Sequence, residues 1–392
     1  MGRSTEARRA VTKLRDTPLP TGLLIGDEWR QTASGGVHAH VNPATGAVQC
    51  EVALAGPAEI DEAVTAARAA FTEWRRWHPA ARRRVLQRLM ELMAHAREEF
   101  VALSALECGI PVQIGKAIVQ MGIDWGESAA TWSDKIAGDV VPSGSDVFDY
   151  SLTEPYGVVG VLLTWNGPAA SVGISVMPAL AAGCCVVVKP SELAPYTSLL
   201  FARLCREAGL PAGVVNVVPG DAAAGAALVA HDGIDKISFT GGVATARAIS
   251  ESCSRRLTPL LLELGGKSAN IVFSDADMAK ALRSAVGIIT LTGQGCIVPS
   301  RLLVEESIYD RFVDQVTGAL ARIPVGDPFD EKTVMGPVIS QTACDRILGF
   351  VDRARETNSG TVLMGGHRLE GALAAGFYLC LLYTSPSPRD RS

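Results

Sequence analysis

Five short apolar runs, rich in valine and leucine, recur along the middle of the chain, and each leads into a glycine turn or a helical stretch. They are VVGVLL from Val158, CVVV from Cys185, VVNVV from Val214, KISF from Lys236, and LLLEL directly after Pro259. Continuous apolar runs of this length, separated by helical stretches, are typical of buried parallel strands in β-α-β units. The sequence therefore predicts an α/β fold built on a doubly wound parallel sheet.

Chemically unusual residues follow these runs at the points where the strands should end. In open parallel sheets, ligands bind in the crevice outside the carboxyl ends of the strands. The residues that follow the five runs should therefore lie together around one crevice. These residues are Thr164-Trp165-Asn166-Gly167-Pro168, Lys189-Pro190-Ser191-Glu192, Pro219-Gly220-Asp221, Thr240-Gly241-Gly242, and Glu263 followed by Leu264-Gly265-Gly266-Lys267.

Composition excludes some classes of partner. The 392 residues are 48% hydrophobic and 20% charged, which predicts a soluble globular protein, with two domains as the expectation for this length. The 36 basic and 41 acidic residues give a formal net charge of -5. No overall positive field is therefore available to attract nucleic acid or an anionic membrane surface.

Cysteine usage and the apolar segments indicate an intracellular protein. The nine cysteines are scattered without the spacing of metal ligands, so we expect reduced thiols and no metal site. The uncharged segment from Pro155 to Val188 is cut by glycines and prolines into pieces too short to cross a bilayer. The charged N-terminal segment MGRSTEARRAVTKLRD is followed by no apolar core of a signal peptide. The expected location is the cytoplasm, without membrane association.

The regions around the five runs have patterns of their own. Residues 57–71 and 85–106 carry apolar side chains at helical spacing, so the N-terminal region should be largely helical. Residues 138–155 alternate polar and β-favouring residues around proline and glycine, which predicts a hairpin outside the main core. A further strand is expected from Ala269, and the boundary of a second region near Gly265-Gly266.

Cys296 is the strongest candidate nucleophile. It lies in LTGQGCIVPSR, where Gly293 and Gly295 allow the backbone to approach a ligand closely. A cysteine in a tight turn can offer both its sulfur and its own amide hydrogen. Alone, it could equally be an inert core cysteine. A cysteine hydrolase would need a histidine brought near by the fold, yet none of the six histidines sits at a strand end.

Two more side chains could take part in catalysis. Glu263 stands in an apolar run, where it is either a salt-bridged structural glutamate or a general base whose pKa is raised by burial. The amide of Asn166 could stabilise an oxyanion, although asparagine before glycine is commonly just a turn.

Other strand-end residues could bind a nucleotide. Lys189 and Glu192 could hold the hydroxyls of a ribose, although a plain loop would look similar. The turn Thr240-Gly241-Gly242, placed before a helix, could present backbone amides to a pyrophosphate, but two glycines in a turn are weak support alone.

In this order, the motifs resemble those of the aldehyde dehydrogenase superfamily, in its NAD(P)-dependent, non-phosphorylating branch. The resemblance runs from Asn42 to about Phe377. It implies a Rossmann-like NAD-binding domain from residues 1–137 and 156–264, an oligomerisation hairpin at 138–155, and a second α/β catalytic domain at 265–380. The motifs that carry it are NPATG, WNGP, KPSE, FTGG, LELGGKS, GQGC and Ser300-Arg301.

The resemblance also implies a mechanism. Cys296 would attack an aldehyde, and the Asn166 side chain with the Cys296 amide would stabilise the oxyanion. Hydride would then leave to the nicotinamide and give a thioester, which water activated by Glu263 would hydrolyse to a carboxylic acid. The presence of Glu263 favours hydrolysis over transfer of the acyl group to coenzyme A.

The cofactor and the assembly are implied in the same way. Glu192 would repel a 2′-phosphate, so NAD is expected rather than NADP. A homodimer or homotetramer is expected of the complete protein. The implied cofactor contacts are Thr164, Trp165, Lys189, Glu192, Gly220, Phe239, Gly241, Gly242 and Leu264.

Some positions depart from the pattern of the family. Gly242 replaces a serine, Ala246 replaces the second glycine of a GxxxxG turn, and Thr164 stands where proline is common. Gly167 replaces an aromatic residue that usually lines the aldehyde tunnel. We therefore expect a wider pocket than average in this chain.

The C-terminal segment departs most. After Gly376-Phe377-Tyr378 the chain reads CLLYTSPSPRDRS, where the family continues with an E-x-F-G-P motif and a last strand. This predicts a truncated catalytic domain and a non-native, disordered tail over residues 381–392. The alternative function is then a catalytically impaired nucleotide-binding fragment of such an enzyme.

Overall fold

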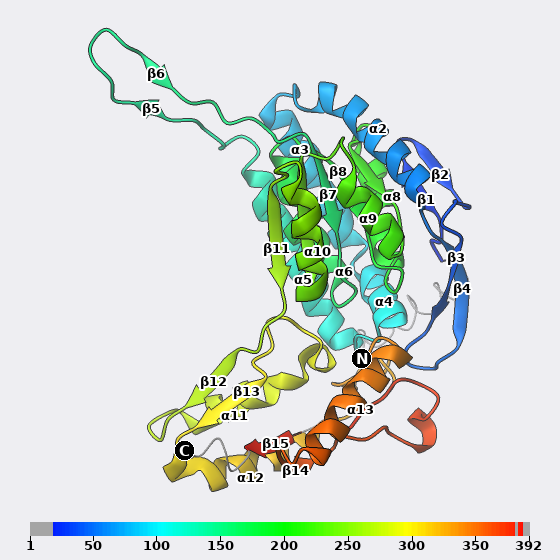
Figure 1. Ribbon diagram of the computed structural model, residues 1–392, viewed down its shortest axis with the longest axis vertical. Coiled ribbons are helices and arrows are strands. Elements are labelled where there is room, and N and C mark those ends of the chain that lie inside the picture. Colours follow the sequence, from blue (N-terminus) through cyan, green and yellow to red (C-terminus); the bar gives the residue numbers. More distant parts are fainter. Residues whose placement is uncertain (1–18, 381–382, 387–392) are drawn as a thin grey trace.

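A seven-stranded sheet forms the centre of the protein, whose computed structural model describes residues 19–380 and 383–386. The strand order is β11-β10-β7-β8-β9-β1-β2. The strands, which Figure 1 shows in green and dark blue, are β1 (Leu23–Ile25), β2 (Glu28–Arg30), β7 (Val158–Leu162), β8 (Cys185–Lys189), β9 (Val215–Val217), β10 (Lys236–Gly241) and β11 (Leu260–Leu264).

All five apolar runs of the sequence are strands of this sheet. From β11 to β9 every pair is parallel, and only β1 and β2 are added in the antiparallel direction. The chain moves outward from β7 to β8 and β9 and then returns to place β10 on the other side of β7. The strand order therefore reverses between β7 and β10, which confirms the doubly wound sheet and marks the crevice where ligands bind.

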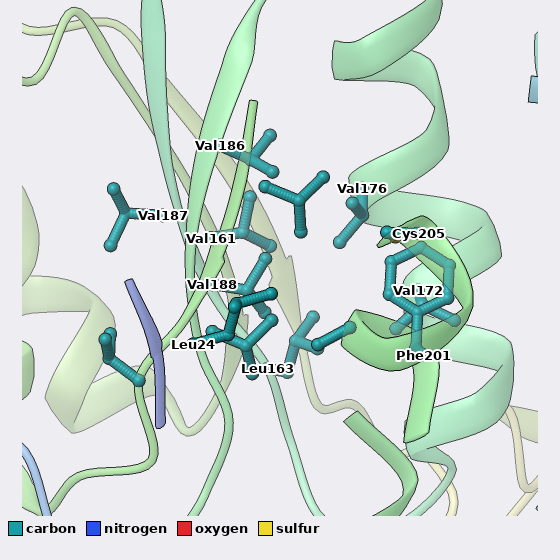
Figure 2. Packing of buried hydrophobic residues seen from close by; sticks show 14 of the residues in the cluster. Leu24, Val161, Leu163, Val172, Val176, Val186, Val187, Val188, Phe201 and Cys205 are labelled. Carbon is teal, nitrogen blue, oxygen red and sulfur yellow. The ribbon is translucent and has the colours of Figure 1, made fainter. Parts of the chain in front are cut away.

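Buried valines form the core around β7 and β8, next to the point where the strand order reverses. Val161 on β7 and Val186 and Val188 on β8 are fully buried. Figure 2 shows them facing Val172 and Val176 of the short π-helix η1 (Val172–Val176) and Phe201 of α8 (Tyr196–Ala208). β-Branched side chains buried on both faces are what parallel strands require.

Helices cover both faces of the sheet. The predicted N-terminal helices are present, but residues 85–106 divide into two helices at Ala96, whose backbone leaves helical geometry at φ -86° and ψ 10°. Gly109, in the left-handed conformation at φ 70°, ends the second of them. The helices of this region are α2 (Pro57–Trp74), α3 (Pro79–His95), α4 (Arg97–Cys108), α5 (Val112–Thr131), α6 (Pro168–Ser171), α7 (Met177–Ala181), α9 (Ala222–Ala230) and α10 (Val243–Ser254).

Two hairpins lie outside the central sheet. β3 (Val37–Val41) and β4 (Val48–Ala53) pair along one side of the molecule. The short strands β5 (Val140–Val141) and β6 (Asp149–Tyr150) pair in an arm that projects from the body in Figure 1, and both strands are exposed. This arm confirms the hairpin predicted for residues 138–155.

The residues after β11 form a separate layer, the yellow and red region of Figure 1. Strand β12 (Ala269–Val272), predicted from the sequence, pairs in parallel with β13 (Arg301–Val304). Val272, Phe312 and Val316 form its own apolar cluster. Its other elements are α11 (Met278–Val286), the 3-10 helices η2 (Gly287–Gly293), η3 (Glu306–Ile308) and η4 (Gly371–Leu373), α12 (Tyr309–Leu320), α13 (Gln341–Glu356) and β14 (Gly360–Met364).

Part of the C-terminal segment is ordered. Residues Tyr383–Pro386 form strand β15, which pairs antiparallel with β14. The prediction of disorder for 381–392 is therefore wrong for these four residues, because main-chain pairing to an open strand edge does not require an apolar composition. Residues 381–382 and 387–392 lie outside the described residues.

One finding bears on membranes. Within the described ranges, no single helix is both long and apolar enough to cross a bilayer. Helices α4 and α5 reach the required length and composition together, but the chain bends by 120° between them.

Candidate active site

Cys296 is the one exposed thiol of the chain. Of the nine cysteines, all within the described residues, six are buried and two are half-buried. Burial raises the pKa of several of them, that of Cys185 to about 12, and a thiol with a raised pKa is a poor nucleophile. Cys296 therefore differs from the other cysteines in being exposed. A nucleophile needs such exposure to contact its substrate.

The turn before Cys296 is strained and held from three directions. Leu291 and Thr292 have φ of 54° and 56°, in the left-handed region that side chains with a Cβ rarely adopt. The Gln294 N–H donates to the Leu291 carbonyl at 3.0 Å, and the Thr292 hydroxyl donates to the Gly336 carbonyl at 3.2 Å. The Gln294 side chain accepts from the Ile339 N–H at 3.0 Å. Strain that persists under such contacts is typical of functional sites.

Asn166, at the carboxyl end of β7, reaches this turn. Its Nδ2 donates to the main-chain carbonyl of Gln294 at 2.6 Å, and its Oδ1 accepts from the Thr164 hydroxyl at 2.8 Å. Thr164 therefore determines which way the amide faces. A side-chain amide has two N–H groups, so the bond to Gln294 uses one of them and leaves the other.

The end of β8 carries a buried cation next to carboxylates. Lys189 is only 8% exposed, and its Nζ donates to the Gly220 carbonyl after β9. Burial lowers the pKa of Lys189, while the charges of Glu192 and Asp221 raise it. Glu192 is half-buried. Lys189, Glu192 and Gly220, which the sequence predicted to bind a nucleotide, are thus brought together.

The end of β10 supplies main-chain donors. Gly242 is the N-cap of α10 and provides no side-chain hydrogen bond. A Cβ at Gly242 would meet nothing within 4 Å, so this helix N-terminus is open. Gly241 packs on the buried Phe239, because a Cβ there would lie 2.4 Å from the phenyl ring. This open helix N-terminus follows β10, and Lys189 and Glu192 follow β8, at the carboxyl edge of the same parallel sheet. A dinucleotide would need such groups for its pyrophosphate and ribose.

Glu263 differs from its expected setting. It was expected to be buried, but its side chain is exposed on β11, the edge strand of the sheet. In the described part of the chain its carboxylate has no hydrogen-bond or ion-pair partner. The apolar neighbours in LLLEL misled the prediction, because the pattern of an edge strand alternates between exposed and half-buried positions. In register, Glu263 lies beside Thr240 on β10.

The other predicted contacts take supporting places. Trp165 is half-buried and packs against the smaller cluster that contains Ile118 and Val338. Leu264, the last residue of β11, packs against the central core. Ala246 is buried one turn into α10 and contributes no polar group to the open N-terminus. At Gly167, a Cβ would have one described neighbour within 4 Å, Ile118 Cγ2 at 3.8 Å.

Gln294 was not among the predicted site residues. Its main-chain carbonyl accepts a hydrogen bond from the Asn166 side chain. Its own side chain accepts one from the Ile339 N–H and so links the cysteine turn to Ile339. The sequence signal was its place in GQGC, between two glycines. Its partners are 128 and 45 residues away, so local pattern alone could not reveal them.

Comparisons with known proteins agree with this geometry. The model of the "Aldehyde dehydrogenase family" matches residues 29–382. The mitochondrial aldehyde dehydrogenase of Homo sapiens is 40% identical over 352 residues, which cover 88% of this chain and 68% of the human protein.

Two solved structures are similar over nearly the whole chain. One is PnpE of Pseudomonas sp. WBC-3, solved in complex with nicotinamide adenine dinucleotide. It has a TM-score of 0.92 at 37% identity, and the match covers 95% of this chain and 77% of the PnpE chain. The NAD⁺ complex of aldehyde dehydrogenase from Bacillus cereus has a TM-score of 0.91 at 34% identity, with 95% and 76% covered. These likenesses show that the chain belongs to the aldehyde dehydrogenase family and is an aldehyde-oxidising enzyme.

Proposed function

We propose that this chain oxidises an aldehyde to a carboxylic acid with NAD, through a covalent intermediate on Cys296. One observation carries the proposal: the turn that exposes Cys296 is hydrogen-bonded to the Asn166 amide at the switch point of the sheet. The proposed nucleophile and oxyanion donor would then act at the edge where doubly wound sheets bind their ligands.

The first step is addition of the Cys296 thiolate to the carbonyl carbon of the aldehyde. The oxygen of the resulting thiohemiacetal carries negative charge, and the second N–H of Asn166 with the main-chain N–H of Cys296 would stabilise it. The Thr164 hydroxyl holds the Asn166 amide so that nitrogen, not oxygen, faces the turn. These donors are held in position before the reaction begins. They need no reorganisation when the negative charge develops, and this is what makes oxyanion stabilisation strong.

The cofactor would be held by Lys189, Glu192 and the N-terminus of α10. Bound there, NAD would supply the hydride acceptor that converts the thiohemiacetal to a thioester. The complexes of PnpE and of the Bacillus cereus enzyme support a dinucleotide in this fold. The charge of Glu192 supports NAD rather than NADP, because a 2′-phosphate would be repelled there.

Hydrolysis of the thioester needs a base, and Glu263 is our candidate. Its exposed carboxylate has no partner in the described part of the chain. It can therefore accept a proton from water without first losing an ion pair or hydrogen bond. Hydrolysis releases the acid and regenerates the Cys296 thiolate.

We also propose that the protein assembles as a homodimer or homotetramer. The projecting β5–β6 arm supports this, because Phe148 is 75% and Tyr150 55% exposed there. Large apolar side chains gathered on one exposed element mark an interaction surface.

The test is NADH formation by the full chain with short, long and aromatic aldehydes, beside Cys296→Ala. We expect absorbance of NADH to rise with the parent chain and not with the variant. Activity that survives Cys296→Ala would reject the covalent mechanism. If calorimetry shows NAD binding while no aldehyde is oxidised, the chain is a nucleotide-binding fragment of such an enzyme instead.

A further inference from the structure

A buried polar cluster lies outside the residues used by the proposed chemistry. It consists of His40 on β3, Cys50 on β4, Glu107 on α4 and Tyr196 at the start of α8. His40, Glu107 and Tyr196 are at most 1% exposed. The rings of His40 and Tyr196 lie 4.6 Å apart, and the Tyr196 hydroxyl is 2.9 Å from the Cys50 sulfur. Buried polar groups are costly, so a cluster of them calls for a role.

The cluster contacts the loop that carries Glu192. This loop joins β8 to α8, and Glu192 stands between two residues that are held in place. Ser191 forms a bridge with Gly220 on one side. On the other, the Leu193 carbonyl accepts a hydrogen bond from His40 Nε2 at 3.1 Å. The Glu192 carboxylate itself has a single long contact, 3.4 Å, with the Ser191 hydroxyl. The position of Glu192 is therefore set by its neighbours.

His40 makes this contact as a neutral imidazole. Its partner is a carbonyl, which can only accept, so Nε2 carries the proton and Nδ1 does not. Nδ1 is buried without a hydrogen-bond partner among the described residues. Burial lowers the pKa of His40 to about 4. The donor at Nε2 is therefore present throughout the neutral range.

Glu107 holds the far end of the same loop. Its side-chain carboxyl group accepts from the Tyr196 N–H at 2.7 Å, from the Thr197 N–H at 3.2 Å and from the Thr197 hydroxyl. Pro195, the N-cap of α8, supplies no side-chain hydrogen bond. Glu107 thus satisfies from α4 the main-chain donors that open a helix. Two bonds within the loop hold its middle: the Leu193 N–H donates to the Ser191 hydroxyl at 3.2 Å, and the Ala194 N–H donates to the Ser191 carbonyl at 3.0 Å. His40 adds a side-chain donor from another element, at the Leu193 carbonyl.

We propose that His40 is a positioning residue for the cofactor, acting through the Leu193 carbonyl to hold Glu192 toward the adenosine ribose. The inference rests on the proposed role of Glu192 in binding NAD. It adds a determinant of cofactor affinity on β3, more than 150 residues away from Glu192 in the chain.

Calorimetric titration of the full chain with NAD tests this without turnover. His40→Phe keeps a ring against Tyr196 but removes the donor, and we expect Kd to rise about tenfold, the effect of one buried carbonyl left unpaired. His40→Gln places an amide N–H near the position of Nε2 and should restore most of the affinity. His38→Phe, on the same strand and without a hydrogen bond to the loop, is the matched control and should bind like the parent.

A double-mutant cycle with Glu192→Ala separates positioning from a general loss of stability. If His40 acts through Glu192, His40→Phe should weaken NAD binding in the parent but have little further effect in the Glu192→Ala background. Equal losses in both backgrounds would overturn the proposal. If circular dichroism shows that His40→Phe does not fold, His40→Asn carries the same cycle, because its shorter amide cannot reach Leu193.

The outcomes also distinguish this inference from the proposed function. A parent chain that does not bind NAD, or Glu192→Ala binding as tightly as the parent, would reject the role of Glu192 and the inference with it. If Glu192→Ala weakens binding and His40→Phe does not, only the role of His40 is rejected.

Discussion

The side-chain nitrogen of Asn166 lies 2.6 Å from the main-chain carbonyl oxygen of Gln294, two residues before Cys296. This bond joins the end of β7 to a turn that belongs to the layer beyond the central sheet. It links the Asn166 amide, the proposed oxyanion donor, to the turn that carries Cys296, the proposed nucleophile.

Removing the Asn166 amide should slow the reaction far more than it destabilises the protein. We expect Asn166→Ala to lower kcat/KM by about 10²–10³, the typical effect of losing one oxyanion donor. Steady-state NADH formation measures the rate, and thermal unfolding provides the control for folding. A loss of less than threefold in a folded variant would contradict the assignment.

The Thr164 hydroxyl should matter through Asn166 alone. Thr164→Val keeps the shape of the side chain but removes the hydroxyl that donates to Asn166 Oδ1. The amide can then turn its oxygen toward the oxyanion, and we expect kcat/KM to fall about tenfold. In the Asn166→Ala background the same change should have almost no effect. Additive losses would show that Thr164 acts by another route.

Loss of the Glu263 carboxylate should stop the second half of the reaction. Glu263→Gln should still form the thioester, so stopped-flow absorbance should show a burst of NADH close to one per active site. Steady turnover should then be slower by about 10²–10⁴, the usual contribution of a general base. Cys296→Ala is the control and should show no burst. Parent-like turnover by Glu263→Gln would exclude the carboxylate as the base.

Glu107 should make stability depend on pH. Burial raises its pKa from 4.5 to about 8. The folded protein therefore keeps this proton up to about pH 8, whereas the unfolded chain loses it near 4.5. The free energy of unfolding should fall as pH rises through this window, by up to about 1.4 kcal/mol per pH unit.

Glu107→Gln resembles the protonated side chain and does not titrate, so it should lose less stability than the parent between pH 5 and pH 8, in urea unfolding measured at each pH. Taking the difference between variant and parent cancels the other titrating groups, including His40. Parallel curves for the two proteins would mean that Glu107 does not bind the proton.

Gly167 should set the width of the substrate pocket. The space beside it is open, with Ile118 Cγ2 at 3.8 Å as the one described neighbour of an added Cβ. Gly167→Phe should lower kcat/KM for bulky aldehydes about tenfold or more and leave short aldehydes nearly unchanged. Equal losses for both classes, measured in one assay with one enzyme preparation, would defeat the idea.

The sheet and the location of its crevice could be predicted because both depend on local pattern. Val158 to Leu162 and Cys185 to Lys189 are buried on both faces, and a continuous apolar run records that directly. The residues after such runs must gather at one edge. The sequence could therefore predict, without any tertiary contact, that this edge carries Asn166, Lys189 and the Gly241-Gly242 turn.

Edges and long-range contacts could not be predicted in this way. The apolar run around Glu263 looks like a central strand, but β11 is the edge of the sheet, and its outer positions remain exposed. The break at Ala96 is equally invisible, because alanine is a good helix former. Tyr383–Pro386 is a strand only because the open edge of β14 pairs with it.

The sequence predicted the α/β class, the five parallel strands, the projecting hairpin and the candidate chemistry of Cys296 and Asn166. Each of these follows from spacing and side-chain type within a short segment. The tertiary structure alone decided that Glu263 is exposed, that Asn166 is held by Thr164 and Gln294, and that His40 supports the loop of Glu192. Hydrogen bonds such as His40–Leu193 depend on how separate elements pack, and packing is a property of the whole fold that leaves no periodic signal in the chain.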